Sequence, residues 1–235
     1  MEGPLLQFHA GSPIIVAGPT GTGKTNWIYK LLVSKNMFTK PIDSILYCYG
    51  VYQPIYNEMR KIIPNITFLN RLPTSEEIDS LNDGNFHLII LDDLMEYVVK
   101  SVETENLFTK KCHHYGITTI YVTQNLFAQG KNHKTTNINT HYLCLFANKR
   151  DESQVMCIGK QVSPYDNKAF VEAYFDATYK MFGYLLIDCD PKSKREFKFR
   201  TKIFPGEDTE IYLSKRFNEF IPSCQIDVIE RGCPF

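Results

Sequence analysis

A glycine-rich stretch near the start of the chain has the residue types of a phosphate-binding loop. It fits the pattern G-x-x-x-x-G-K-[ST] with the residues Gly18, Pro19, Thr20, Gly21, Thr22, Gly23, Lys24 and Thr25. Glycines let consecutive backbone N–H groups curve around phosphate oxygens, and a following helix directs the positive end of its dipole at the same anion. Lys24 would add a positive charge for the β- and γ-phosphates, and the Thr25 hydroxyl could ligate Mg²⁺. The pattern predicts binding of ATP with Mg²⁺; the alternative is a glycine-rich turn without a ligand.

Two consecutive acids, Asp92 and Asp93, follow the apolar run at residues 86–91. An ionised carboxylate at the end of a buried strand is costly unless it is exposed, paired or near a metal. Beside a phosphate-binding loop, Asp92 would hold Mg²⁺ directly or through water. Asp93 could orient and deprotonate the attacking water. An ordinary acidic turn would look the same, but the phosphate-binding loop favours the catalytic interpretation.

A third polar group, Gln124, ends the β-branched run at residues 118–123. An amide at this end of a strand can form a hydrogen bond with the γ-phosphate or with the attacking water, and can therefore respond to hydrolysis. A glutamine at the same position could equally cap a helix. We expect Gln124 to act together with Lys24 and Asp93.

The elements that would position these groups alternate between apolar runs and helix-compatible stretches, which is typical of a mostly parallel sheet flanked by helices. We expect strands at residues 14–17, 44–49, 66–69, 87–91, 118–123 and 142–146. Helices are expected at residues 24–34, 54–62, 75–81, 104–114 and 165–179. Two further strands, 183–189 and 196–204, should form a β-hairpin across the turn at 190–194. We expect a single α/β domain over residues 1–235, with a core at about 8–160, an extension of helix plus hairpin at about 164–207, and a tail at 208–235.

The composition is that of an ordinary globular protein, with 43% hydrophobic and 22% charged residues. The 26 basic and 26 acidic residues cancel, so a surface that binds nucleic acid would have to be local. No apolar run approaches the roughly 18 residues of a membrane span, and the first residues lack the basic start of a secretory signal. Seven cysteines without a C-x-x-C pair predict reduced thiols in an intracellular protein rather than a disulfide framework or a zinc site.

Together, the motifs resemble those of P-loop ATPases of the FtsK/HerA superfamily. Within it they resemble the genome-packaging ATPases of double-stranded DNA viruses, of the Polinton and adintovirus type and their poxvirus relatives. The resemblance extends over roughly residues 8–207 and rests on stretches at 16–21, 49–56, 91–95, 122–127, 146–151, 183–188 and 203–207. The segment Thr123-Gln124-Asn125-Leu126-Phe127 and the pair Arg150-Asp151 are far more specific than the phosphate-binding loop, which many proteins share.

The resemblance implies a RecA-like core in which the strand ending at Gln124 lies between the phosphate-loop strand and the Asp92 strand. It implies a homo-oligomeric ring, a pentamer or hexamer, with a nucleotide at each subunit boundary. Double-stranded DNA and a capsid or portal protein would be partners, without a membrane, in the host cytoplasm or nucleus or in the virion. In such rings an arginine of the neighbouring subunit stabilises charge at the γ-phosphate. Arg150 is the first candidate, with a surface ion pair to Asp151 or Glu152 as the alternative, and Arg71 is the second.

Two positions depart from the pattern of the superfamily. The second acid is Asp93, where many members carry a glutamate whose side chain is one methylene longer, so Asp93 would have to sit closer to the attacking water or act through another water. Lys134 stands where an arginine is expected, and a lysine cannot offer the bidentate fork of a guanidinium.

A DNA motor needs local Lys and Arg side chains that contact phosphates without reading sequence. Lys131 and Lys134, in the segment after Gln124, are candidates. Lys198 and Arg200 are the others, because an alternating strand over 197–202 would put its cations on one face. That strand could equally be a sheet edge whose lysines prevent aggregation.

Three functions fit the sequence. The leading hypothesis is an ATP-hydrolysing motor that translocates double-stranded DNA, most plausibly into a viral capsid. The second is a P-loop nucleotide or small-molecule kinase, although no compact arginine cluster is evident for its lid. The third is a nucleotide-gated assembly subunit that binds ATP and DNA with little turnover, which the aspartate at position 93 keeps open.

Overall fold

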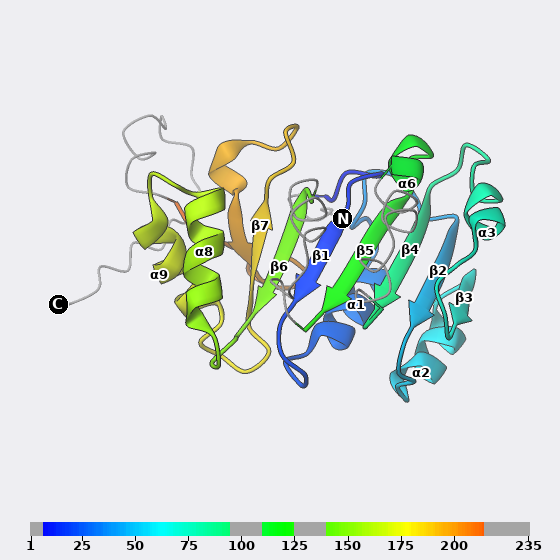
Figure 1. Ribbon diagram of the computed structural model, residues 1–235. Coiled ribbons are helices and arrows are strands. Elements are labelled where there is room, and N and C mark those ends of the chain that lie inside the picture. Colours follow the sequence, from blue (N-terminus) through cyan, green and yellow to red (C-terminus); the bar gives the residue numbers. More distant parts are fainter. Residues whose placement is uncertain (1–6, 95–109, 125–139, 214–235) are drawn as a thin grey trace.

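The computed structural model describes residues 7–94, 110–124 and 140–213 (Figure 1). In this part of the chain a nine-stranded sheet has the order β3-β2-β4-β5-β1-β6-β7-β8-β9. The strands are β1 (Ile14–Ala17), β2 (Ser44–Tyr49), β3 (Ile66–Leu69), β4 (His87–Asp92), β5 (Thr118–Thr123), β6 (Tyr142–Phe146), β7 (Tyr184–Asp188), β8 (Phe199–Thr201) and β9 (Glu210–Ile211). The six strands predicted for the core are confirmed, with β4 extending one residue further, to Asp92.

The first six strands of the chain pair in parallel, and the last three pair antiparallel. Because parallel strands all end on one side, the segments after β1, β4, β5 and β6 meet at a single edge of the sheet, here called the carboxyl edge (Figure 1). Strand β5 lies between β1 and β4. This order is the one that the RecA-like core requires, and it brings the phosphate-binding loop, the acids and Gln124 to the same edge.

The described helices are α1 (Lys24–Val33), α2 (Ile55–Ile62), α3 (Ser75–Asp79), α6 (Cys112–His114), α8 (Glu152–Val162) and α9 (Asn167–Ala177). They lie on both faces of the sheet (Figure 1). Helix α9 is two residues shorter at each end than the predicted helix at 165–179. The predicted helix at 104–114 is described only from residue 110 onward, and its earlier part lies outside the described residues.

Helix α8 was not predicted from the sequence. The carboxylate of Asp151 caps its start by accepting a hydrogen bond from the backbone N–H of Gln154 at 3.3 Å. The helix buries Val155 and Ile158 against the sheet. Gly159 weakens the helical pattern in the sequence, but a Cβ there would lie only 2.4 Å from Cδ1 of Phe170 on α9. The glycine therefore permits close helix packing, which outweighs its low helix propensity.

The C-terminal hairpin is confirmed in part. Strands β7 and β8 are antiparallel, with Leu186 opposite Arg200. The predicted second strand at 196–204 was too long, because residues 195–197 form a short 3-10 helix, η2 (Arg195–Phe197). Strand β9, which was not predicted, pairs with β8 on its other side. Strand β8 is therefore not an edge of the sheet, and the edge-protection interpretation of its lysines was wrong.

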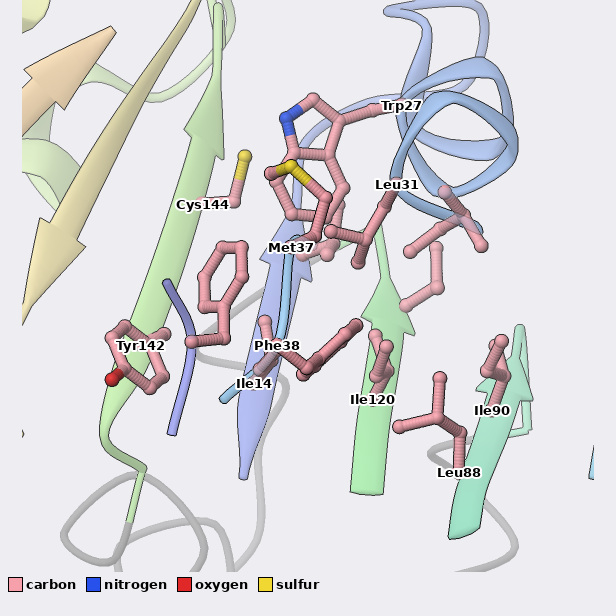
Figure 2. Packing of buried hydrophobic residues seen from close by; sticks show 14 of the residues in the cluster. Ile14, Trp27, Leu31, Met37, Phe38, Leu88, Ile90, Ile120, Tyr142 and Cys144 are labelled. Atoms are coloured by element: carbon pink, nitrogen blue, oxygen red, sulfur yellow. The ribbon is translucent and has the colours of Figure 1, made fainter. Parts of the chain in front are cut away.

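The core consists of two apolar layers, one on each face of the sheet. In β1, Ile14 packs in the layer that contains α1, and Ile15 packs in the layer that contains α8 and α9. Figure 2 shows the first layer, with Trp27 and Leu31 of α1 beside the side chains of the strands. Burial on both faces explains why the parallel strands read as nearly continuous apolar runs. Within the described residues, no helix has the length and apolarity needed to cross a membrane.

Candidate nucleotide-binding site

The phosphate-binding loop connects β1 to α1 at the carboxyl edge (Figure 1). Gly18 lies directly against β6, since a Cβ at this position would be 2.6 Å from Cβ of Phe146. Gly23 is the N-cap of α1 with a backbone φ of 99°, a left-handed conformation that residues other than glycine rarely adopt. The backbone of Gly23 then accepts a helical hydrogen bond from the N–H of Trp27 at 2.9 Å. The glycines therefore allow a tight loop that opens directly into a helix N-terminus, as an anion site requires.

The Lys24 side chain folds back over its own loop. Its Nζ donates hydrogen bonds to the carbonyl oxygens of Gly18 at 2.6 Å and Pro19 at 2.9 Å. Burial lowers the pKa of Lys24, and the charges of Asp92 and Asp93 act in the opposite direction. Lys24 therefore lies close enough to both acids to interact with them electrostatically, on the same side of the molecule.

Asp92 ends β4 and is 5% exposed. Two tyrosine hydroxyls donate to its Oδ2, that of Tyr47 on β2 at 2.8 Å and that of Tyr56 on α2 at 3.0 Å. Burial raises the pKa of Asp92, while the two hydroxyls and the charge of Lys24 oppose this rise. Burial also raises the pKa of each tyrosine, as does the negative charge of Asp92, so both hydroxyls remain protonated donors.

Asp92 and Thr25 fit the expected magnesium site by the chemistry of their donor atoms. Both tyrosine hydroxyls bind Oδ2, and Oδ1 of Asp92 accepts no hydrogen bond from the described part of the chain. A carboxylate oxygen and a hydroxyl oxygen are ligands that Mg²⁺ accepts, together with water and substrate phosphates. Asp92 and Thr25 could therefore hold the ion, with Tyr47 and Tyr56 fixing the orientation of the carboxylate.

Asp93 is exposed and has a backbone φ of 59°, in the left-handed region. Its N–H donates to the carbonyl of Val122 on β5 at 3.2 Å. Gly50 leaves room for this turn, because a Cβ there would lie 2.9 Å from the Asp93 carbonyl oxygen. Such a conformation costs energy for a residue with a side chain, although Asp tolerates it better than most. The turn directs the chain away from β4 immediately after the buried Asp92.

Gln124 connects the phosphate-binding loop to the second acid. Its Nε2 donates to Oδ1 of Asp93 at 3.2 Å, and its Oε1 accepts a hydrogen bond from Oγ1 of Thr20 at 3.1 Å. All three side chains are exposed at the carboxyl edge. One amide therefore contacts both the loop expected to hold phosphate and the acid expected to activate water. Sequence reasoning placed Gln124 correctly near these groups but did not indicate the two hydrogen bonds.

Arg150 follows β6 and therefore also lies at the carboxyl edge. Its backbone N–H donates to Oδ1 of Asn148 at 3.2 Å, and its side chain is exposed. The alternative was an ion pair with Asp151 or Glu152, and neither is formed in the described residues. The Asp151 carboxylate caps α8 instead. The second candidate, Arg71, forms a bidentate ion pair with Glu77, with distances of 2.7 and 2.8 Å.

Of the four cations expected to contact DNA, the structure describes Lys198 and Arg200. Arg200 is 2% exposed and donates to Oδ2 of Asp188 at 2.7 Å, so its side chain is unavailable to a phosphate backbone and the expectation for Arg200 was wrong. The prediction failed because β8 is an inner strand buried on both faces. Lys198 lies outside β8, and its Nζ donates to the carbonyl oxygen of Val162 at the end of α8. Lys131 and Lys134 lie outside the described residues.

No protein-family model matches the chain, and no curated protein sequence matches it. Among solved structures, the genome-packaging NTPase B204 from Sulfolobus turreted icosahedral virus 2 in complex with ATP-gammaS has a TM-score of 0.50 at 12% identity, covering 86% of this chain and 96% of that chain. B204, the DNA-packaging ATPase from Sulfolobus Turreted Icosahedral Virus, has a TM-score of 0.50 at 12% identity, covering 88% of this chain and 98% of that chain. At such identities the likeness concerns the fold. The chain therefore has the α/β fold of these viral packaging NTPases, a mostly parallel sheet flanked by helices that ends in an antiparallel hairpin.

Proposed function

We propose that this protein is an ATP-hydrolysing motor that translocates double-stranded DNA and packages a viral genome into a capsid. The observation that carries the proposal is a pair of hydrogen bonds at Gln124, which accepts one from Thr20 of the phosphate-binding loop and donates the other to Asp93. Lys24 lies within electrostatic range of both acids at the same edge. The fold shared with packaging NTPases supports the same proposal. We assign residues 1–235 to a single P-loop ATPase domain.

In the proposed reaction, the triphosphate binds against the loop, and Lys24 exchanges its hydrogen bonds to the carbonyls of Gly18 and Pro19 for phosphate oxygens. Bound Mg²⁺ would supply positive charge for the β- and γ-phosphates. Asp93 accepts a proton as the water oxygen bonds to the γ-phosphorus and the bond to the leaving β-phosphate oxygen breaks, giving ADP and phosphate. The hydroxyls of Tyr47 and Tyr56 and the charge of Lys24 favour the ionised form of Asp92 and oppose the rise that burial causes in its pKa.

Coupling to movement would begin at Gln124. When the γ-phosphate leaves, the hydrogen bonds between Gln124, Thr20 and Asp93 must rearrange, because the groups around them change charge. Gln124 is followed by the segment that contains Lys131 and Lys134, the proposed DNA contacts. A displacement at the amide would therefore pass along a few residues of chain to cations that hold the phosphate backbone.

The site is proposed to be completed by a second copy of the chain. Arg150 is exposed at the carboxyl edge and forms no ion pair with the described residues. In a homo-oligomeric ring of five or six subunits it would point at the γ-phosphate of the neighbour and stabilise charge in the transition state. A capsid or portal protein would hold the ring at the point where DNA enters.

The test is a steady-state ATPase assay with and without linear duplex DNA. The wild-type protein should hydrolyse ATP, and DNA should raise the rate. Lys24→Ala should abolish turnover, whereas Lys30→Ala, a matched control on the same helix whose Nζ pairs with Glu207 at 3.2 Å, should not. Wild-type hydrolysis by Lys24→Ala would contradict the proposal. Phosphoryl transfer to an acceptor would indicate a kinase, and ATP binding without turnover would indicate a nucleotide-gated assembly subunit.

A further inference from the structure

An exposed aromatic turn lies beside the phosphate-binding loop. It connects α9 to β7, and three of its side chains are largely exposed: Tyr179 at 88%, Met181 at 83% and Phe182 at 57%. Since β7 runs antiparallel to β6, with Tyr184 opposite Phe146, this turn lies at the carboxyl edge. Figure 1 shows it at the same end of the sheet as the loop that follows β1.

Phe182 contacts the phosphate-binding loop itself. A Cβ placed on Gly23 would lie 3.0 Å from Cδ1, 3.3 Å from Cβ and 3.4 Å from Cγ of Phe182. The aromatic ring therefore packs against the residue that joins the loop to α1, and more than half of its surface stays open to solvent. The phosphate-binding loop determines where the triphosphate would lie. The nucleoside attached to it would then extend past Phe182 or its neighbours.

The turn between α9 and β7 contains a residue with a strained backbone. Phe182 has a backbone φ of 62°, a left-handed conformation that favours glycine or asparagine. Gly183 follows it, and its N–H donates to the carbonyl of Lys180 at 2.9 Å. No side chain would fit at Gly183, because a Cβ there would lie 2.4 Å from the carbonyl oxygen of Ala177. A strained backbone that presents a large apolar ring to solvent beside a ligand loop is typical of a binding position.

We propose that Phe182 is a stacking platform for the base of the bound nucleotide, flanked by Tyr179 and Met181. The ligand is a purine nucleoside triphosphate, recognised at its base through the aromatic face rather than through hydrogen bonds. The proposal rests on the proposed ATP site, since the phosphates place the base. Both parts of the site then contribute to the affinity for ATP: the loop binds the phosphates, and Phe182 binds the base.

The test compares binding of ATP and of inorganic tripolyphosphate by calorimetry. Phe182→Ala should weaken ATP binding by about tenfold, the scale of one base–aromatic stack, and should leave tripolyphosphate binding unchanged. Phe182→Tyr should keep ATP affinity within about twofold because it retains the ring. Lys24→Ala should lose both ligands. Tyr165→Ala is the control, since Tyr165 is 87% exposed in the connection between α8 and α9, at the far end of α9 from this turn.

Several outcomes would overturn the proposal. Equal weakening of ATP and tripolyphosphate by Phe182→Ala would mean that the ring only supports the loop. Unchanged ATP affinity would exclude stacking, and if the mass of the protein also fell to that of a monomer, the turn would be an intersubunit surface. A wild-type protein that binds neither ligand would remove this proposal together with the ATP site. A protein that binds ATP without hydrolysing it would refute the motor and still test Phe182.

Discussion

The hydroxyl of Tyr47 donates a hydrogen bond of 2.8 Å to Oδ2 of Asp92, and both residues are buried. Tyr56, on helix α2, donates a hydrogen bond to the same oxygen. The carboxylate at the end of β4 is therefore held by two neutral donors that direct Oδ1 away from them. Hydrogen bonds to a charged acceptor are stronger than neutral ones, so this pair orients the carboxylate of Asp92 and favours its ionised form against the effect of burial.

Removing one of these hydroxyls should impair hydrolysis without unfolding the protein. We expect Tyr47→Phe and Tyr56→Phe each to lower kcat by about tenfold, the usual scale for a group that orients a metal ligand. The hydroxyls lower the pKa of Asp92, so their removal should raise it, and the acid limb of the pH–rate profile should move to higher pH.

The matched control is Tyr49→Phe. Tyr49 belongs to the same aromatic cluster, with its ring centroid 5.0 Å from that of Tyr56, but its hydroxyl makes no hydrogen bond to Asp92 in the described residues. Its removal should leave the rate and the pH profile unchanged. If all three variants behave alike, the hydroxyls have no specific effect on Asp92.

Asp92→Asn should stabilise the fold while abolishing hydrolysis. Burial raises the pKa of Asp92 above its usual 3.8, so the folded state holds this proton more tightly than the unfolded chain does. The associated stabilisation is fully present below the unfolded pKa and is lost as pH rises through the folded pKa. An asparagine avoids that loss and can still accept both tyrosine hydrogen bonds through its carbonyl oxygen.

The measurement is chemical denaturation at two pH values. At pH 7 we expect the free energy of unfolding of Asp92→Asn to exceed that of the wild type by about 1 kcal/mol. Stabilising substitutions at sites kept for function are commonly of this size. The difference should shrink towards pH 4. Asp93→Asn, at an exposed position where asparagine also tolerates the left-handed backbone, should show no such gain. A loss of stability in Asp92→Asn at pH 7 would mean that Lys24 and the tyrosines outweigh the burial cost.

The positions of these groups could be predicted from the sequence because they follow from the strands. Parallel strands end at one edge, so the residues after β1, β4 and β5 had to lie near one another once the strands were recognised. The position of β5 between β1 and β4 was implied by the family resemblance, and the strand order confirms it. Lys24, Asp92, Asp93 and Gln124 therefore lie at the edge where the sequence predicted them, and their chemical roles stay predictions.

Residues that act through contact across the fold could not be found in this way. Tyr47 and Tyr56 come from different elements and meet Asp92 only in three dimensions, although Tyr47, near the end of the strand neighbouring the acid, is a usable signal. The assignment of Arg200 failed for a related reason. An alternating strand of cations and Phe predicts one face open to solvent, but β8 is buried on both faces, and the unpredicted strand β9 pairs with one of its edges.

The buried pair of Arg200 and Asp188 should contribute to stability and not to DNA binding. Their side chains are 3% and 2% exposed, and removing one partner of such a pair leaves an uncompensated charge. Arg200→Met should destabilise the protein by about 3–5 kcal/mol in urea unfolding. Adding Asp188→Asn should recover much of this loss, since the charge is gone and the carbonyl oxygen can still accept from the N–H of Asp190. DNA affinity of this double variant should equal that of the wild type; a folded double variant that no longer binds DNA would restore Arg200 as a contact.

Rings that mix two inactive variants can show whether Arg150 acts in the nucleotide site of the neighbouring subunit. Arg150→Ala should still bind ATP but hydrolyse it about a thousandfold more slowly, the scale of an arginine that stabilises phosphoryl transfer. Asp93→Asn should be inactive for lack of the base. In rings assembled from both variants, some boundaries combine Asp93 of one subunit with Arg150 of the next, so part of the activity should return. Mixing Arg150→Ala with the double variant Asp93→Asn/Arg150→Ala offers no intact arginine and should give no rescue. If the first mixture is as inactive as the second, Arg150 does not act across the boundary, and the arginine that does must lie elsewhere in the chain.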